Sequence, residues 1–161
     1  MCPQKSLFLR MSQITLLPNL IMLADDDADD RLLFEEALKE IDRQTEITTA
    51  TDGEHLMNLL SQELQTNLSV IFLDLNMPKK NGFECLKEIR QKDKLKHIPV
   101  VVYSTSCQGE SIDKMYEFGA SYYICKPNNF NKLKNSIEHI FSIGLHKLFP
   151  QPSKENFVIA Y

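Results

Sequence analysis

Five short strand-like runs alternate with five segments of helical periodicity, and this alternation restricts the fold more than any other feature. Four of the runs are apolar and cover residues 20–24, 70–73, 99–103 and 122–125. The run at 46–50 is a weaker strand signal, which rests on its β-branched residues, and the segment after each run repeats apolar residues at the spacing of an amphipathic helix. Strands that alternate with helices through short connections form a parallel sheet with right-handed crossovers. The sequence therefore predicts an α/β fold in which helices cover both faces of a five-stranded parallel sheet.

The length and charge of the chain indicate one domain without general affinity for nucleic acid. A chain of 161 residues, 43% of them hydrophobic, can form one well-packed domain. The 18 Lys and Arg residues are outnumbered by 22 Asp and Glu residues, so the net charge of -4 opposes nonspecific binding to nucleic acid. We expect a flexible N-terminal leader at 1–18, the domain at 19–143 and a C-terminal tail at 144–161 that is too short for a DNA-binding module.

The sequence also indicates a cytoplasmic protein without structural cross-links. No apolar run approaches the roughly 20 residues of a membrane helix, and the first 24 residues lack the order of a secretory signal. The four cysteines show neither a C-x-x-C pair nor a zinc-binding spacing, which predicts no disulfide framework and a reducing cytosol. By its place in an apolar run, Cys125 is expected to be a small buried residue rather than a reactive thiol.

Polar residues end four of the five predicted strands. Asp25 and Asp26 follow the first strand, Asp74 follows the third, and Ser104 and Lys126 follow the fourth and fifth. Parallel strands place their carboxyl ends at one edge of the sheet, where ligand crevices form, so these side chains should meet.

Three neighbouring carboxylates repel one another unless a cation joins them, and Mg²⁺ prefers such oxygen ligands. A metal, a carboxylate nucleophile, a hydroxyl and an ammonium together suit phosphoryl transfer. The further acids Asp27, Asp29 and Asp30 are expected to cap the next helix and to lie outside this site.

The order of these residues resembles the receiver domain of response regulators in two-component signalling. The family pattern is an acidic pair after the first strand, an acceptor Asp after the third, a Ser or Thr after the fourth and Lys-Pro after the fifth. In this chain the corresponding residues are Asp25-Asp26, Asp74 within DLNMP, Ser104 and Lys126-Pro127. The resemblance covers about residues 19–143 and implies a flavodoxin-like doubly wound sheet of strand order 2-1-3-4-5.

The resemblance also implies a role for each residue of the predicted site. Asp74 would be the phosphoacceptor, and Asp25 and Asp26 would hold Mg²⁺ together with Asp74 and the backbone carbonyl of Asn76. Ser104 and Lys126 would bind phosphoryl oxygens. Thr105 and Ser106 are alternative hydroxyls, but the spacing favours Ser104. Periodicity alone places Tyr123 equally well in the core, and only the resemblance makes it the aromatic residue of the switch.

The leading interpretation is a phosphoacceptor switch rather than an enzyme with an external substrate. It would receive a phosphoryl group from a histidine kinase or a phosphotransfer protein and catalyse its own phosphorylation and dephosphorylation. Output would pass to a protein partner through the surface of the fourth helix, fifth strand and fifth helix, without nucleic acid or membrane. Two alternatives are a Mg²⁺-dependent phosphohydrolase with an aspartyl-phosphate intermediate and a receiver-like module that is never phosphorylated.

Overall fold

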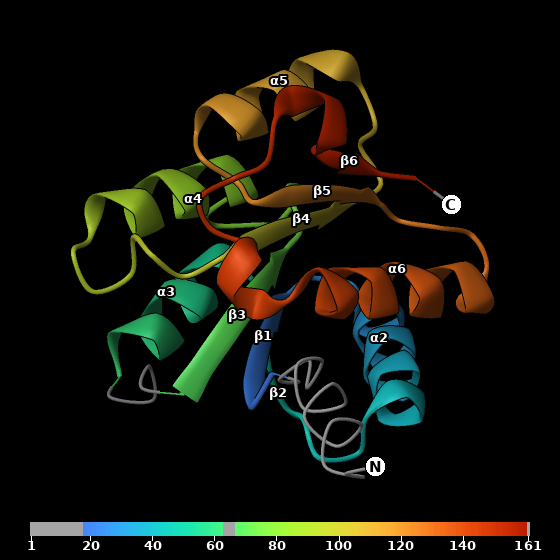
Figure 1. Cartoon of the computed structure of the whole chain (residues 1–161). Helices are drawn as coiled ribbons and strands as arrows, with labels where there is room; N and C mark the ends of the chain where they lie inside the picture. The colour runs from blue at the N-terminus through green and yellow to red at the C-terminus, as the bar shows by residue number, and fades with distance from the viewer. Residues whose placement is uncertain (1–17, 63–66, 161) are drawn as a thin grey trace, which may run out of the picture.

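The computed structural model describes residues 18–62 and 67–160, and it shows one six-stranded sheet in which every paired strand is parallel (Figure 1). The strand order is β2-β1-β3-β4-β5-β6, which confirms the predicted order of the first five strands and adds a sixth. The strands are β1 Leu20–Ala24, β2 Glu46–Ala50, β3 Leu68–Leu73, β4 Val100–Ser104, β5 Tyr122–Cys125 and β6 Val158–Ile159. In the register of the central strands, Phe72 lies between Leu23 of β1 and Val101 of β4. The predicted leader lies almost entirely outside the described residues.

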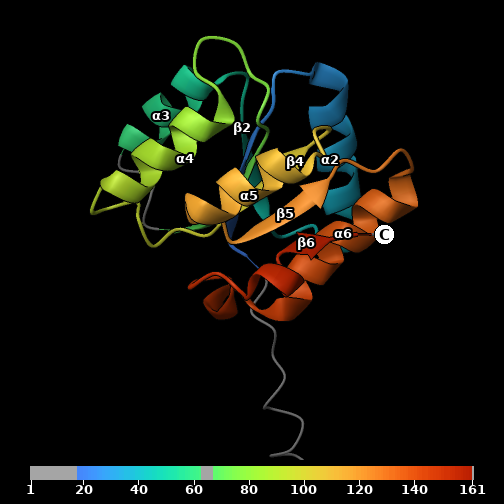
Figure 2. The ribbon, with the colours of Figure 1, turned by 90° about the horizontal axis from the view of Figure 1, so that it is seen from above.

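Helices cover both faces of the sheet, as the alternation predicted (Figure 2). Helices α2 Ala28–Ile41 and α6 Phe130–Ile143 pack on one face, and α3 Gly53–Ser61, α4 Gly82–Gln91 and α5 Gly109–Glu117 pack on the other. Neighbouring residues of a strand point to opposite faces, so each strand contributes to both cores. Ile71 belongs to the core under α3, α4 and α5, whereas Phe72 belongs to the core under α2 and α6. Among the described residues, no helix is both long and apolar enough to span a bilayer.

Helix α2 begins immediately after the acidic loop because Asp27 caps it. The Asp27 side chain accepts hydrogen bonds from the backbone amides of Asp29 and Asp30, and both of these acids lie in the first turn of the helix. The cap satisfies amides that have no partner within the helix, and the two acids complement the positive end of the helix dipole. The prediction that these acids cap the helix and occupy its first turn is therefore confirmed. The cap also determines where the chain that carries Asp25 and Asp26 turns from β1 into α2.

The residues predicted as a C-terminal tail pack against the sheet and supply its sixth strand. Two short 3-10 helices, η3 Leu145–Lys147 and η4 Lys154–Asn156, lead to β6, which pairs with β5. Leu148 and Phe157 are fully buried. Burying these apolar side chains against the edge of β5 explains why the segment folds back. A two-residue strand is too short for any periodic pattern, so no signal for it is present in the sequence.

The prediction of no disulfide is wrong for one cysteine pair. Cys107, in the loop between β4 and α5, is bonded to Cys125 at the end of β5, with their Cα atoms 5.7 Å apart. The bond also corrects the assignment of Cys125 as a buried space-filling residue, because its side chain is only half-buried. The parallel sheet brings the ends of β4 and β5 together although the two cysteines are 18 residues apart in the chain. Cys85 is the buried free cysteine of the described residues.

Candidate phosphorylation site

The carboxyl ends of β1, β3, β4 and β5 bring the predicted site residues to one edge of the sheet. Backbone hydrogen bonds continue the sheet pairing beyond the strand ends: the amide of Asp25 donates to Ala50 at 3.0 Å and the amide of Asp74 donates to Ala24 at 2.9 Å. The amide of Lys126 likewise donates to the carbonyl of Ser104 at 2.8 Å. The backbones that carry these side chains are therefore held by the rigid sheet rather than by loose loops.

Three acidic side chains form the centre of the site. The carboxylates of Asp25, Asp26 and Asp74 each offer an oxygen within 4.8 Å of the others. Asp25 and Asp74 are buried, whereas Asp26 is exposed. Burial raises the pKa of Asp25 above its ordinary value, although nearby Lys126 opposes that shift. Bringing three carboxylates together costs free energy unless a cation compensates their charge.

Lys126 supplies a positive charge to this cluster. Its Nζ atom lies 2.7 Å from Asp25 Oδ2 and 3.3 Å from Asp74 Oδ2, and its side chain is only 7% exposed. Burial disfavours the charged ammonium, but its hydrogen bonds and ion pairs with the acids outweigh burial and hold the pKa of Lys126 above its ordinary value. Lys126 therefore stays protonated beside Asp74.

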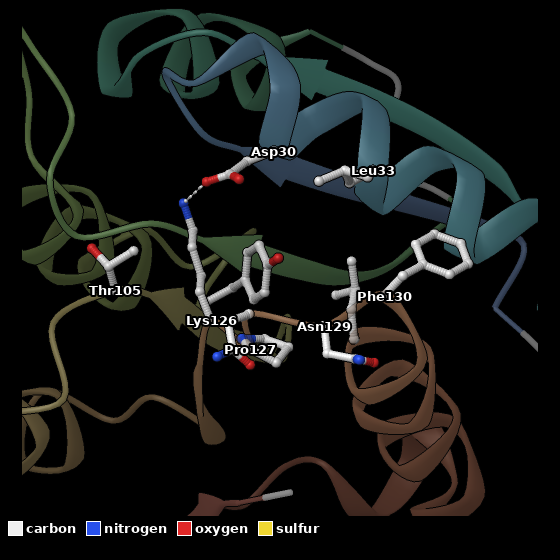
Figure 3. A pocket seen from close by; sticks show the side chains of 10 residues that line it. Asp30, Leu33, Thr105, Lys126, Pro127, Asn129 and Phe130 are labelled. Carbon is white, nitrogen blue, oxygen red and sulfur yellow. Dashed lines mark hydrogen bonds and ion pairs between the residues drawn. The ribbon is translucent and has the colours of Figure 1, made fainter.

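Asp30 belongs to the site, which corrects the expectation that it lies outside. Its Oδ2 atom accepts a hydrogen bond from Lys126 Nζ at 2.8 Å, and Figure 3 shows this contact. Asp30 does lie in the first turn of α2, as expected, but this turn faces the end of β5, so the same residue also contacts Lys126. Only its position in the turn after the acidic pair could have suggested this contact.

The acidic cluster fits a divalent metal ion. Asp25 Oδ2 is buried, and its contact with Lys126 Nζ at 2.7 Å is an ion pair outside hydrogen-bond geometry. Asp74 presents Oδ1 to the amides of Leu75 at 2.7 Å and Asn76 at 3.5 Å, and its Oδ2 atom is the one near Lys126. Hard divalent ions take such carboxylate oxygens as ligands and keep several waters. The donor set is therefore suited to a metal held at the exposed side of the cluster, where Asp26 lies.

The predicted hydroxyl and aromatic residues lie beside the acids. Ser104 is fully buried at the end of β4, and its Oγ atom accepts a hydrogen bond from the amide of Ser106 at 3.3 Å. Tyr123 is also fully buried, and its hydroxyl donates to the backbone carbonyl of Ser106. Burial, followed by the charge of Asp74, raises the pKa of Tyr123 to about 12. Ser106 thus connects the hydroxyl of Ser104 to that of Tyr123.

A hollow of about 380 Å³ opens beside Lys126, between α2 and the loop that leads into α6 (Figure 3). Asp30, Leu33 and Thr105 line it together with Phe130. Leu33 is 45% exposed, so the wall that α2 contributes to the hollow is partly apolar and open to solvent. The hollow gives a small molecule or a partner side chain access to Lys126 from the solvent.

A parallel sheet with an acidic cluster and a lysine at its carboxyl edge is the architecture of a receiver domain. The family model of the response regulator receiver domain matches residues 21–138. The chain belongs to this family, whose members take part in two-component signalling with histidine kinases and downstream targets.

Individual relatives match this chain over most of its length. It is 36% identical over 132 residues to the response regulator Rcp1 of Synechocystis sp., a match that spans 80% of this chain and 90% of Rcp1. The structure of the phosphorylated cyanobacterial phytochrome response regulator RcpA superimposes with a TM-score of 0.72 at 37% identity, covering 79% of this chain and 94% of that one. The Mn²⁺-bound form of Rcp1 gives a TM-score of 0.69 at 36% identity, covering 78% and 93% of the two chains. These similarities agree with a divalent metal site among the acids.

Proposed function

We propose that this receiver domain is a phosphorylation-driven switch in which Asp74 accepts the phosphoryl group. The observation that carries the proposal is the position of Asp74 at the end of β3, with Lys126 3.3 Å from its Oδ2 atom and two further acids within 4.8 Å. The donor would be a histidine kinase or a phosphotransfer protein in the cytoplasm. Mn²⁺ is named for a related structure, and Mg²⁺ is the ion proposed for this site.

The proposed reaction transfers the phosphoryl group to a carboxylate oxygen of Asp74. A new P–O bond forms on Asp74 while the P–N bond to the donor histidine breaks, and the leaving imidazole takes the bonding electrons. Lys126 then pairs with one oxygen of the transferred group, since it already lies against Asp74. A metal held by Asp25, Asp26, Asp74 and the carbonyl of Asn76 would neutralise negative charge on the phosphoryl oxygens. Hydrolysis of the aspartyl phosphate by water resets the switch.

The proposed conformational change passes through Ser104 and Tyr123. Phosphorylation adds a charge of about −1.5 to −2 and several acceptor oxygens beside the end of β4. The Ser104 hydroxyl would turn to donate to one of them and give up its hydrogen bond with the Ser106 amide. Because Tyr123 is bonded to the carbonyl of Ser106, any shift of this residue changes the position that the tyrosine prefers.

We propose that output passes to a protein partner over the surface of α5, β5 and α6, without contact to nucleic acid or membrane. In the structure, β6 lies along β5 on this side of the molecule, so the C-terminal segment belongs to the proposed surface (Figure 1). Phe118 and Val158 are large apolar residues exposed near it, at 39% and 36%. A partner would therefore contact β6 rather than a bare edge of β5.

The test is incubation with Mg²⁺ and acetyl phosphate, followed by intact mass. The chain should gain one phosphate group, and Asp74→Asn should gain none. Asp29→Asn is the matched control, because Asp29 is an exposed acid near the site that makes no contact with Lys126. Labelling that persists in Asp74→Asn would place the acceptor elsewhere, and an unlabelled wild type would favour a module that is never phosphorylated. Many turnovers of phosphate ester per chain would favour the phosphohydrolase.

A further inference from the structure

The disulfide between Cys107 and Cys125 connects two segments that the proposed switch moves relative to each other. Cys107 lies three residues after Ser104, in the loop from β4 to α5. Cys125 ends β5, directly before Lys126 and two residues after Tyr123. The bond therefore joins the loop that follows the hydroxyl to the strand that carries the lysine and the aromatic residue. Apart from the disulfide, the described residues hold this loop to β5 through hydrogen bonds, such as the one from the Tyr123 hydroxyl to the Ser106 carbonyl.

Both sulfur atoms belong to residues that solvent can reach. Cys107 is exposed and Cys125 is half-buried, whereas the free Cys85 is fully buried. The Cα separation of 5.7 Å lies within the range over which two cysteines form a disulfide without backbone movement. A small disulfide molecule would therefore react with Cys107 first and could form the bond without unfolding of the sheet, and a small thiol could reduce the bond in the same way.

We propose that Cys107 and Cys125 form a reversible redox modification site whose state controls the conformational response to phosphorylation at Asp74. The oxidant is a low-molecular-weight disulfide such as oxidised glutathione. The thiolate of Cys107 attacks one sulfur of this molecule and releases one glutathione thiolate. The thiolate of Cys125 then attacks the mixed disulfide and releases the second glutathione. The two cysteines are oxidised, the glutathione disulfide is reduced, and the two cysteine protons end on the two released thiols.

The expected consequence follows from what the bond fixes. In the dithiol form, the loop after Ser104 can move toward a phosphoryl group, while hydrogen bonds alone resist the movement. In the disulfide form, residue 107 cannot leave residue 125, which keeps Ser106 at the hydroxyl of Tyr123. Oxidation should therefore leave Asp74 able to accept phosphate but remove the rearrangement of the loop. The inference rests on the proposed phosphorylation at Asp74 and on the loop movement that accompanies it.

The first part of the experiment asks whether the pair reacts. The full chain, carrying Cys2→Ser to remove a cysteine unrelated to the pair, is equilibrated in buffers of reduced and oxidised glutathione. Intact mass should show the loss of two hydrogen atoms, and peptide mapping should find Cys107 joined to Cys125. Excess reduced glutathione should restore both thiols. A pair that stays reduced in every buffer, or that does not return to the dithiol, overturns the proposal.

The second part asks whether the bond controls the switch. Hydrogen exchange of the peptides that cover residues 105–112 is compared with and without acetyl phosphate and Mg²⁺, in the oxidised and reduced forms. Phosphorylation should change the exchange of these peptides in the reduced form, and this change should be lost after oxidation. Cys107→Ser is the matched control and should respond equally in both buffers. An oxidised chain that responds as the reduced chain does overturns the proposal.

The labelling of the reduced chain separates this inference from the proposed function. If reduced protein and Cys107→Ser both fail to gain phosphate, phosphorylation at Asp74 is wrong, and the redox control that depends on it fails with it. If both are labelled but oxidation has no effect, only the redox control is wrong.

Discussion

Replacing Phe157 by alanine tests whether the C-terminal segment is part of the folded core. The Phe157 side chain is fully buried, with its ring centre 5.1 Å from that of Tyr116 and 6.1 Å from that of Tyr123. Its carbonyl also accepts a hydrogen bond from the amide of Tyr123 at 2.9 Å. The ring therefore packs between the C-terminal segment, α5 and β5, and its removal affects all three.

The expected loss is large compared with the stability of a single domain. Removing a buried phenylalanine side chain costs about 3 to 5 kcal/mol, because the apolar transfer is lost and a cavity remains. Domains of this kind are stable by only about 5 to 15 kcal/mol. Phe157→Ala should therefore lower the free energy of unfolding by about 3 kcal/mol or more, or by less if residues 144–160 detach and leave no cavity.

Urea unfolding at pH 7, followed by far-ultraviolet circular dichroism, measures this loss. Val158→Ala is the matched control, because Val158 is the neighbouring residue and is 36% exposed. Its cost should stay below about 1 kcal/mol, as for other partly exposed positions. The slope of the unfolding free energy against urea should fall only if the segment detaches, since less surface is then exposed on unfolding. Equal midpoints for the two variants would refute the reasoning that this segment is anchored by Phe157.

Three further predictions concern the site and the cysteines. Asp30→Asn removes a carboxylate that competes with the phosphoryl group for Lys126. Labelling by acetyl phosphate at saturating Mg²⁺ should therefore become about two- to five-fold faster, as expected for the loss of a partly exposed ion pair. Slower labelling would contradict this role of Asp30. Lys126→Ala should still be labelled on Asp74, but the phosphorylation-dependent change in hydrogen exchange at residues 105–112 should disappear, and an unchanged response would exclude Lys126 from the switch. Burial raises the pKa of Cys85 to about 12, so its thiol should stay protonated at pH 8. It should not react with iodoacetamide until the chain is unfolded with urea. Modification of Cys85 in the native chain would refute its burial.

Much of the site could be predicted from the sequence because parallel strands end at one edge. Residues that directly follow neighbouring parallel strands lie at the same edge of the sheet, so their side chains come close together whatever the details of packing. Asp25, Asp74 and Lys126 are such residues, and Lys126 forms ion pairs with both acids. The short spacing between each strand and the next helix cap left little freedom in where these side chains lie.

Other features depended on contacts between segments that no local pattern records. Asp30 has the local signature of a first-turn acid, and only the packing of α2 beside the end of β5 brings it to Lys126. Cys107 and Cys125 become neighbours only because β4 and β5 pair in register.

The C-terminal segment shows the same division between sequence and tertiary structure. The sequence by itself determined the alternation of strands and helices, and with it the edge where the functional residues gather, because both follow from local periodicity and the handedness of the chain. Only the tertiary structure decided that Phe157 would pack against Tyr123 and that β6 would extend the sheet. Such a contact depends on the shape of a distant surface, and two residues of strand are too few to reveal that shape in advance.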